Sequence, residues 1–213
     1  MLYVFGDSWG YGSELDENEK PFGYYLSVKL NQDYTNYSKP GASLGHITGL
    51  VISNADSIKQ DDHVVIVIPP DIRWYLIDDD FQFKSLSLSN DDYKKLLRHY
   101  NESWFVYHHN LFIYTIITTI LTKTSNLVLC HNYGKLVIHE WFKNLIDTKY
   151  FLSNKSLTEL LLGNLWEDNY SLDFDGPTTD VFQGKYFEGK ISHPNLKGHL
   201  EITRLIYEKF NEK

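Results

Sequence analysis

Short apolar runs alternate with longer amphipathic stretches along most of this chain, and these runs predict the strands of a sheet. Residues 2–5 and 34–37 are two such runs, residues 63–68 (His-Val-Val-Ile-Val-Ile) are the clearest, and residues 126–130 form a fourth. A continuous β-branched run is typical of a parallel strand that is buried on both faces. The pattern therefore predicts a largely parallel sheet.

Apolar positions at helical spacing predict helices between and after these strands. Pro21 opens the first helix, because proline is tolerated in a first turn, and Ser43 fits the N-cap of the second, which should run to about residue 58. Four further helices are expected, at about residues 92–122, 139–147 and 156–162 and after Pro194. The Ile/Thr-rich second half of the long helix also fits a strand. Loops are expected at residues 78–92 and 163–192.

Strands that alternate with helices predict an α/β fold, a three-layer α/β/α sandwich around a central, mostly parallel sheet. No repeat, low-complexity block or flexible linker marks a boundary, so we expect residues 1–213 to form one domain. Functional sites in such folds lie outside the carboxyl ends of the strands. Three turns should therefore share one edge of the sheet, at residues 6–12, 39–45 and 69–74.

Composition narrows the functional classes. The chain is 42% hydrophobic and 23% charged, which is typical of a soluble globular protein. Proteins that bind nucleic acids usually carry an excess of basic residues, whereas this chain has a formal charge of −8. No nucleic-acid partner is therefore expected. The longest uninterrupted run of apolar residues and threonine, residues 111–121, is short of the roughly 20 residues that span a bilayer. With no signal-peptide pattern either, we expect no membrane partner and a cytoplasmic location. The oligomeric state is not indicated.

Metal and cofactor motifs are not evident in the sequence. The histidines lack metal spacing such as His-Glu-x-x-His, and Cys130 is the single cysteine, so neither a zinc site nor a disulfide is expected. Gly6, Gly10 and Gly12 do not have the Gly-x-Gly-x-x-Gly spacing of dinucleotide binding. The sequence therefore predicts a function without metal or cofactor.

A candidate nucleophile, Ser8, lies in the string Gly6-Asp7-Ser8-Trp9-Gly10, directly after the first strand. A serine between glycines in a tight turn presents its hydroxyl beside a backbone N–H that can receive an oxyanion. The string fits Gly-x-Ser-x-Gly of the α/β-hydrolases, but several strands normally precede that serine. A role as a helix cap or turn residue stays equally open from this turn alone.

A candidate base, His193, directly precedes Pro194 at the expected start of the last helix. Proline restricts the backbone there, so the imidazole would be presented from a rigid loop, as a general base for a serine requires. A His-Pro pair is also common in purely structural loops. His199, further along, is expected on the last helix, either facing solvent or packing.

Together, Phe5-Gly6-Asp7-Ser8, Gly41 and His193-Pro194 resemble the first, second and fifth sequence blocks of the SGNH/GDSL hydrolases, in order and spacing over almost the whole chain. The resemblance implies a flavodoxin-like α/β/α fold and a serine that attacks an ester or thioester. It implies Ser8 as the nucleophile, His193 as the base, and the N–H groups of Ser8 and Gly41 as part of the oxyanion hole.

Two positions depart from the family pattern. Pro70 stands where the third block has an oxyanion-hole Asn, and proline carries neither an amide side chain nor an N–H. Arg73 lies nearby and either supplies positive charge or is simply solvated. Lys190 stands where the family has an Asp that orients the histidine. Glu188, Asp180 or a backbone carbonyl are the candidate replacements.

The leading hypothesis is a serine-dependent ester hydrolase that acts on a small-molecule or glycan ester, an O-acetyl group on a carbohydrate being one candidate. Asp7, Trp9, Arg73 and Trp74 are expected near the substrate, where the aromatic rings either stack on a sugar or only wall the pocket. The alternative is a catalytically degenerate binding module with the same fold, for a glycan or acyl ligand. A nucleotide-binding flavodoxin-like protein is disfavoured by the bulk of Asp7 and Trp9.

Overall fold

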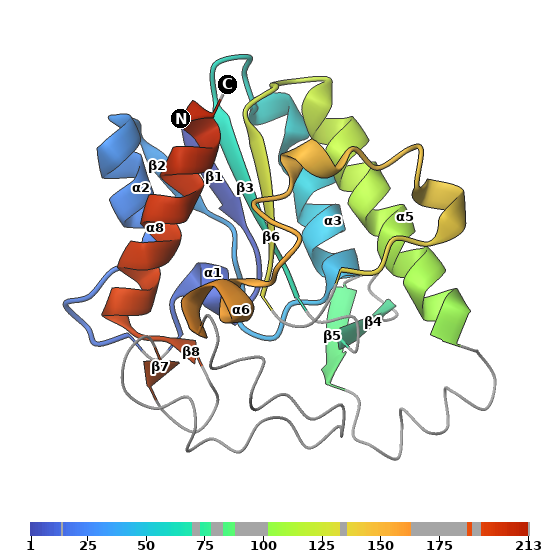
Figure 1. The fold of residues 1–213 in the computed structure, drawn as a ribbon, viewed down its shortest axis with the longest axis horizontal. Coiled ribbons are helices and arrows are strands. Elements are labelled where there is room, and N and C mark those ends of the chain that lie inside the picture. The colour runs from blue at the N-terminus through green and yellow to red at the C-terminus, as the bar shows by residue number, and fades with distance from the viewer. Residues whose placement is uncertain are drawn as a thin grey trace.

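A four-stranded parallel sheet, in the order β2-β1-β3-β6, forms the centre of the computed structural model (Figure 1). Its strands are β1 (Leu2–Phe5), β2 (Tyr34–Asn36), β3 (His63–Ile68) and β6 (Leu127–His131). All four match the predicted apolar runs, and every pairing is parallel. The structure describes residues 1–13, 15–69, 73–77, 83–87, 102–132, 136–162, 187–188 and 193–212, of which 73–77, 83–87, 102 and 187–188 are described by their backbone alone.

Helices cover both faces of the sheet. α2 (Phe22–Leu30) and α8 (Leu196–Asn211) pack together on one face, and α3 (Leu44–Asn54) and α5 (Glu102–Leu121) pack together on the other (Figure 1). The predicted three-layer α/β/α sandwich is therefore confirmed.

The two faces of the sheet carry two separate cores. Along β3, Val64, Ile66 and Ile68 belong to the core beneath α3 and α5, whereas Val65 and Val67 belong to the core beneath α2 and α8. Successive side chains of a strand point to opposite faces, so a strand that is covered on both sides must be apolar at every position. This explains the unbroken apolar run that identified β3 in the sequence.

The helix α5 continues through the Ile/Thr-rich segment that also fitted a strand. Its isoleucines recur at helical spacing on the buried side, at Ile113, Ile116, Ile117 and Ile120. Its threonines face outward and donate back to the helix, as Thr118 Oγ1 does to the carbonyl of Tyr114 at 2.9 Å. Residues 92–101 of the predicted helix lie outside the described residues.

The second predicted helix is shorter than expected. Ser43 caps it as predicted, accepting from the N–H of His46 at 3.3 Å. The α-helix ends at Asn54, however, and a 3₁₀ turn, η1 (Ala55–Ser57), follows it.

The prediction of a helix at 139–147 is wrong, because this segment forms isolated 3₁₀ turns. η2 (Glu140–Phe142) and η3 (Thr148–Tyr150) each begin at a residue whose side chain accepts a local N–H, His139 and Asp147 respectively. Such local caps satisfy the backbone without a longer helix. The short helix predicted at 156–162 is present as α6 (Leu157–Leu162).

Two predicted loops contain strands. β4 (Arg73–Ile77) and β5 (Phe83–Ser87) pair antiparallel, and β7 (Phe187–Glu188) pairs antiparallel with β8 (His193–Pro194). Each strand is stabilised by backbone hydrogen bonds to the other strand of its pair. The pattern of polar and apolar residues does not show that two such segments pair. The other residues of 78–92 and 163–192 lie outside the described part.

The carboxyl ends of the parallel strands meet at one end of the molecule, where α1 (Ser8–Tyr11), α6 and β8 gather (Figure 1). Both chain termini lie at the opposite end. Among the described residues, no helix combines the length and apolarity that a membrane span requires.

Candidate active site

Ser8 is the first residue of α1, immediately beyond the end of β1. Asp7 caps this helical turn, because its Oδ1 accepts the N–H of Trp9 at 3.1 Å. As the first helical residue, Ser8 has a backbone N–H with no acceptor inside the helix. The predicted turn is thus a capped helical turn that holds the serine at its N-terminal end.

Close packing against the loop after β2 fixes α1 in place. The side chain of Asn36 donates to the carbonyl of Gly10 at 2.9 Å. A Cβ at residue 10 would collide with the side chain of Ser38. Glycine is therefore required at residue 10 by a close approach between two segments.

His193 reaches Ser8 from the other end of the chain. Its Nε2 lies 2.8 Å from Ser8 Oγ, a hydrogen bond across 185 positions of sequence. Both residues are nearly buried, with 4% and 7% of their surfaces exposed. The histidine is held in β8, and Asn195 then caps α8 by accepting the N–H of Gly198 at 3.0 Å. The structure thus brings together the two residues that the sequence marked.

Gly41 lies in a turn that is tied to the same end of the sheet. Ala42 donates to the carbonyl of Lys39 at 3.0 Å, and Gly41 has φ +76°. With Pro40 before it, this is the arrangement of a type II turn, whose third residue needs positive φ. Lys39 in turn donates to the carbonyl of Gly6 at 3.0 Å, which joins the turn to the loop that carries Ser8.

The remaining predicted site residues are less fully described. Glu188 lies in β7, directly opposite His193 in the strand register. Arg73 and Trp74 lie in β4 and are described by their backbone only. Pro70, Asp180 and Lys190 lie outside the described residues.

Two residues expected near the substrate lie instead in the protein interior. Trp9 is 1% exposed and packs into the core beneath α2 and α8, so its ring presents no open face for a sugar. Asp7 is fully buried, and its carboxylate is engaged by hydrogen bonds from Trp9 and from Asn132, the latter at 2.9 Å. The physical reason for Asp7 is that its carboxyl group accepts from two buried donors, and for Trp9 that its ring packs among apolar side chains.

Asn132, at the carboxyl end of β6, is a site residue that the sequence analysis missed. Its amide donates to Asp7 across 125 positions of sequence. The available signal was its place directly after a predicted strand, where functional residues of α/β folds gather.

His199 is fully buried on α8 and has a structural contact. Its Nδ1 accepts the N–H of Phe22, the first residue of α2, at 3.2 Å, and its ring stacks on that of Phe22. Burial, together with the nearby charge of His193, lowers the pKa of His199 to about 3. His199 is therefore neutral at ordinary pH and joins two helices.

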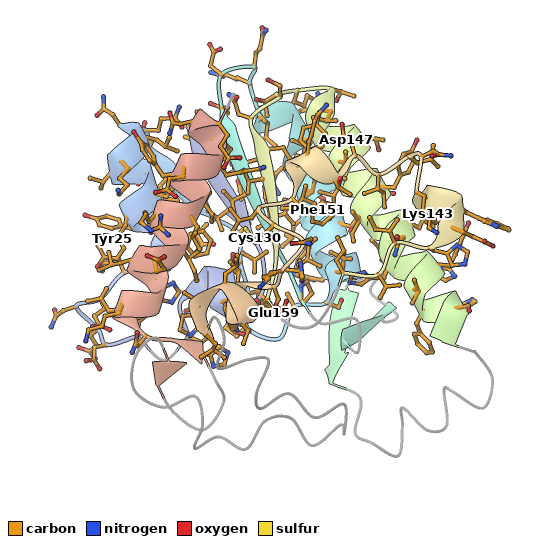
Figure 2. All side chains as sticks on the ribbon, in the orientation of Figure 1. Tyr25, Cys130, Lys143, Asp147, Phe151 and Glu159 are labelled. Carbon is orange, nitrogen blue, oxygen red and sulfur yellow. The ribbon has the colours of Figure 1, made fainter. Side chains whose placement is uncertain are left out.

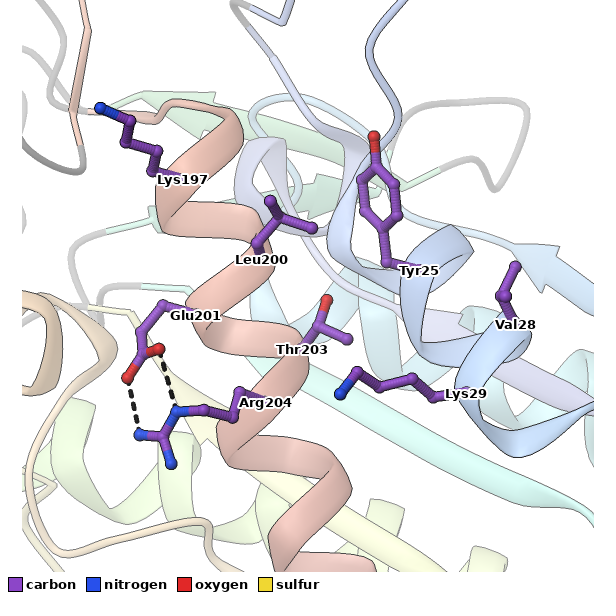
Figure 3. A pocket seen from close by; sticks show the side chains of 8 residues that line it. All are labelled: Tyr25, Val28, Lys29, Lys197, Leu200, Glu201, Thr203 and Arg204. Atoms are coloured by element: carbon purple, nitrogen blue, oxygen red, sulfur yellow. Dashed lines mark hydrogen bonds and ion pairs between the residues drawn. The ribbon is translucent and has the colours of Figure 1, made fainter.

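A groove of about 550 Å³ lies between α2 and α8, away from these residues (Figure 3). Apolar and basic side chains line it, including Val28, Leu200 and Lys29.

Cys130 is buried in the interior near the middle of the molecule (Figure 2), and burial raises its pKa. Within the described residues, no group of three His, Cys, Asp or Glu side chains is placed to hold a metal ion.

No protein-family model matches the chain, and no curated protein sequence does. Among solved structures, LAE5, an alpha/beta hydrolase enzyme from the metagenome of Lake Arreo in Spain, matches with a TM-score of 0.53 at 11% identity, over 99% of this chain and 94% of that one. The Bacillus subtilis protein YXIM matches with a TM-score of 0.51 at 14% identity, over 99% of this chain. The chain shares the α/β/α sandwich fold of these two proteins.

The matched structures differ in how much of their own length this chain covers. This chain spans 56% of the length of YXIM. A member of the lipolytic G-D-S-L family from Veillonella parvula is also similar, with a TM-score of 0.46 at 18% identity, over 99% of this chain and 96% of that one. At such identities, structural similarity establishes the fold alone, and the chemistry has to be argued from the site itself.

Proposed function

We propose that this protein hydrolyses an ester, with Ser8 as the nucleophile and His193 as the general base and then the acid. The observation that carries the proposal is the 2.8 Å hydrogen bond between Ser8 Oγ and His193 Nε2. A nucleophile and its base must lie within hydrogen-bond reach, at about 2.6–3.2 Å. The position of the pair, at the carboxyl ends of the strands, is where sites of this kind of fold form.

The proposed reaction passes through an acyl-serine. His193 Nε2 takes the proton of Ser8 Oγ as this oxygen bonds to the ester carbonyl carbon. The resulting oxyanion is received by backbone N–H groups, for which Ser8 and Gly41 are the candidates. Collapse breaks the bond to the alcohol oxygen, which leaves with the proton from the imidazolium. Water, deprotonated by the same imidazole, then releases the acid and restores Ser8.

Glu188 is our candidate for the group that orients the imidazole. The register of β7 and β8 sets residue 188 directly opposite residue 193. Directly opposite residues of an antiparallel pair share a face and interact. Asp180 is the second candidate, and a backbone carbonyl would leave a Ser-His dyad.

The substrate class that we propose is a small acyl ester, with an O-acetyl group on a carbohydrate as the first candidate. Two features support this substrate class. The chain is rich in Trp and Tyr, whose flat rings can stack on sugars. Arg73 and Trp74 are the first residues of β4, which follows the turn after β3 in the sequence. A panel of acetyl, butyryl and octanoyl p-nitrophenyl esters, followed by acetylated oligosaccharides, separates these classes. Preference for the octanoyl ester would contradict the acetyl assignment.

The test of the reaction is hydrolysis of p-nitrophenyl acetate by the wild type, Ser8→Ala and His193→Ala. Wild-type turnover should exceed that of either variant by at least about 10³-fold, since the pair acts as a unit. A fluorophosphonate probe should add its phosphonyl mass to the wild type and not to Ser8→Ala. Equal rates for all three proteins would contradict the proposal.

The second candidate is a binding module that uses the same pocket without catalysis. The observations that favour it are Pro70 and Lys190, which stand where the family has catalytic groups. In that case acetylated oligosaccharides would bind the wild type in calorimetry without being consumed, and the fluorophosphonate would leave Ser8 unlabelled.

A further inference from the structure

A buried amide reaches over the end of β3 toward the loop that carries Ser8. Asn132 follows β6, whose neighbour in the sheet is β3 and whose next neighbour is β1. Its Nδ2 nevertheless donates to Asp7 Oδ2, beyond the end of β1, at 2.9 Å. The side chain must therefore cross the carboxyl end of β3 to make this bond.

The backbone of Asn132 is held firmly. Its N–H donates to the carbonyl of Ile68, at the end of β3, at 3.2 Å. Its carbonyl accepts both the N–H of Thr158 at 3.2 Å and the hydroxyl of Thr158 at 2.6 Å. A side chain on such a fixed backbone is preorganised, which is what a catalytic donor needs.

The amide group itself is only half used. Asn132 is fully buried, yet within the described part of the chain its Oδ1 accepts no hydrogen bond. Nδ2 carries two hydrogens, and its one bond among the described residues goes to Asp7. Leaving a buried polar atom unpaired costs about 1–3 kcal/mol, so a half-used amide that is bonded to the residue before Ser8 requires an explanation.

The two residues that follow β3 in the sequence cannot donate a backbone hydrogen bond. The chain continues there with Pro69-Pro70, and proline has no N–H. The Asn132 amide crosses this same strand end from the neighbouring strand. The amide therefore supplies an N–H donor at a strand end that two prolines follow.

We propose that the second N–H of the Asn132 amide donates to the oxyanion that forms when Ser8 attacks its ester, so that Asn132 completes the oxyanion hole with the backbone N–H groups. This assignment rests on the proposed hydrolase function. The bond to Asp7 Oδ2 fixes the amide plane and sets the nitrogen, not the oxygen, toward the cap of α1. The second hydrogen then points away from Asp7.

The experiment compares the wild type, Asn132→Ala, Asn132→Leu and Asn110→Ala for hydrolysis of p-nitrophenyl acetate and for unfolding in urea. Asn110 is the matched control: it is also fully buried and uses its side chain for three hydrogen bonds, to Val106, Val137 and His139, on α5 and beside it. Both Asn132 variants should lose about 10²–10³-fold in kcat with KM changed by less than about threefold, as for other oxyanion donors. Asn110→Ala should lose stability and keep kcat.

Inhibitor affinities distinguish a role in catalysis from a purely structural role of Asn132. A trifluoromethyl ketone, which forms a tetrahedral adduct with an activated serine, should bind Asn132→Leu more weakly by the factor that kcat/KM loses. The acid product should bind the variant and the wild type equally. Asn132→Leu keeps roughly the side-chain volume and adds no charge beside Asp7, so this part of the experiment remains informative if Asn132→Ala folds poorly.

Each outcome decides a different claim. Wild-type hydrolysis that is independent of Ser8 overturns the proposed function and this assignment with it. Ser8-dependent hydrolysis with Asn132 variants within about threefold of the wild type overturns the Asn132 assignment alone. Equal kcat losses in Asn110→Ala and Asn132→Ala also overturn it, because instability would then be the cause.

Discussion

At the scale of single residues, the structure separates two histidines that lie six positions apart on the same segment. His193 faces Ser8, whereas His199 is buried and uses Nδ1 to accept the N–H of Phe22. The missing side-chain cap of α2, whose N-cap is Pro21, explains the second role, since a helix start leaves N–H groups that need acceptors. The sequence predicted a helix through His199 but did not reveal this contact, because the partner lies 177 positions away.

The buried state of His199 predicts a loss of stability in acid. Because burial lowers its pKa from 6.5 to about 3, the unfolded chain binds more protons than the native one between these values. The free energy of unfolding should therefore fall as pH decreases below about 6.5, by up to about 1.4 kcal/mol per pH unit from this group, and level off near pH 3. Urea unfolding from pH 7 to 4 measures the slope. His199→Asn, which keeps an acceptor but cannot be protonated, should show a shallower slope, and an identical slope would contradict the assignment.

A second prediction at this scale concerns Gly10. A Cβ at residue 10 would collide with Ser38, so Gly10→Ala should destabilise the protein by about 1–3 kcal/mol, the usual cost of overpacking. Ser38→Gly in the same chain should recover most of that loss, because it removes the atoms that would be struck. Urea unfolding of the two single variants and the double variant measures the coupling. Strictly additive effects would show that the glycine is needed for another reason.

At the scale of elements, the sequence predicted well wherever burial is periodic and poorly wherever long-range pairing decides. The isoleucines of α5 recur on the buried side, and the strand β3 is apolar throughout because both of its faces are covered. The strand β8 has only two residues and exists because β7 pairs with it. No local pattern encodes such a pairing, so the segment that positions His193 was expected to be a loop.

The buried face of α5 gives a prediction for that element. Ile116→Ala should cost about 2–5 kcal/mol, because the side chain is fully buried between α5 and the sheet and its removal leaves a cavity. Thr118→Ala, two positions later on the exposed side, should change stability by less than about 0.5 kcal/mol. Thermal or urea unfolding distinguishes the two variants, and equal costs would mean that α5 does not pack as described.

At the scale of the whole molecule, the candidate site joins the two ends of the chain. Ser8 follows the first strand, and His193 precedes the last helix, yet both lie at the same end of the sheet. The sequence could predict this meeting because parallel strands bring their carboxyl ends together. It could not predict Asn132 in the same way, because its reach over β3 to Asp7 depends on which strands are neighbours in the sheet.

This arrangement predicts how activity is lost on unfolding. α8 and α2 pack together over the sheet, and Thr203 on α8 donates to the carbonyl of Phe22 at 3.1 Å, so the segment after His193 is part of the main core. Ser8-dependent hydrolysis and the far-ultraviolet circular dichroism signal should therefore disappear at the same urea midpoint, as expected of one cooperative unit. Activity that is lost at a clearly lower urea concentration, while the helix signal persists, would mean that β8 opens on its own. The site would then depend on the short β7–β8 pair, and the connection of α8 to the core would not be what holds His193 against Ser8.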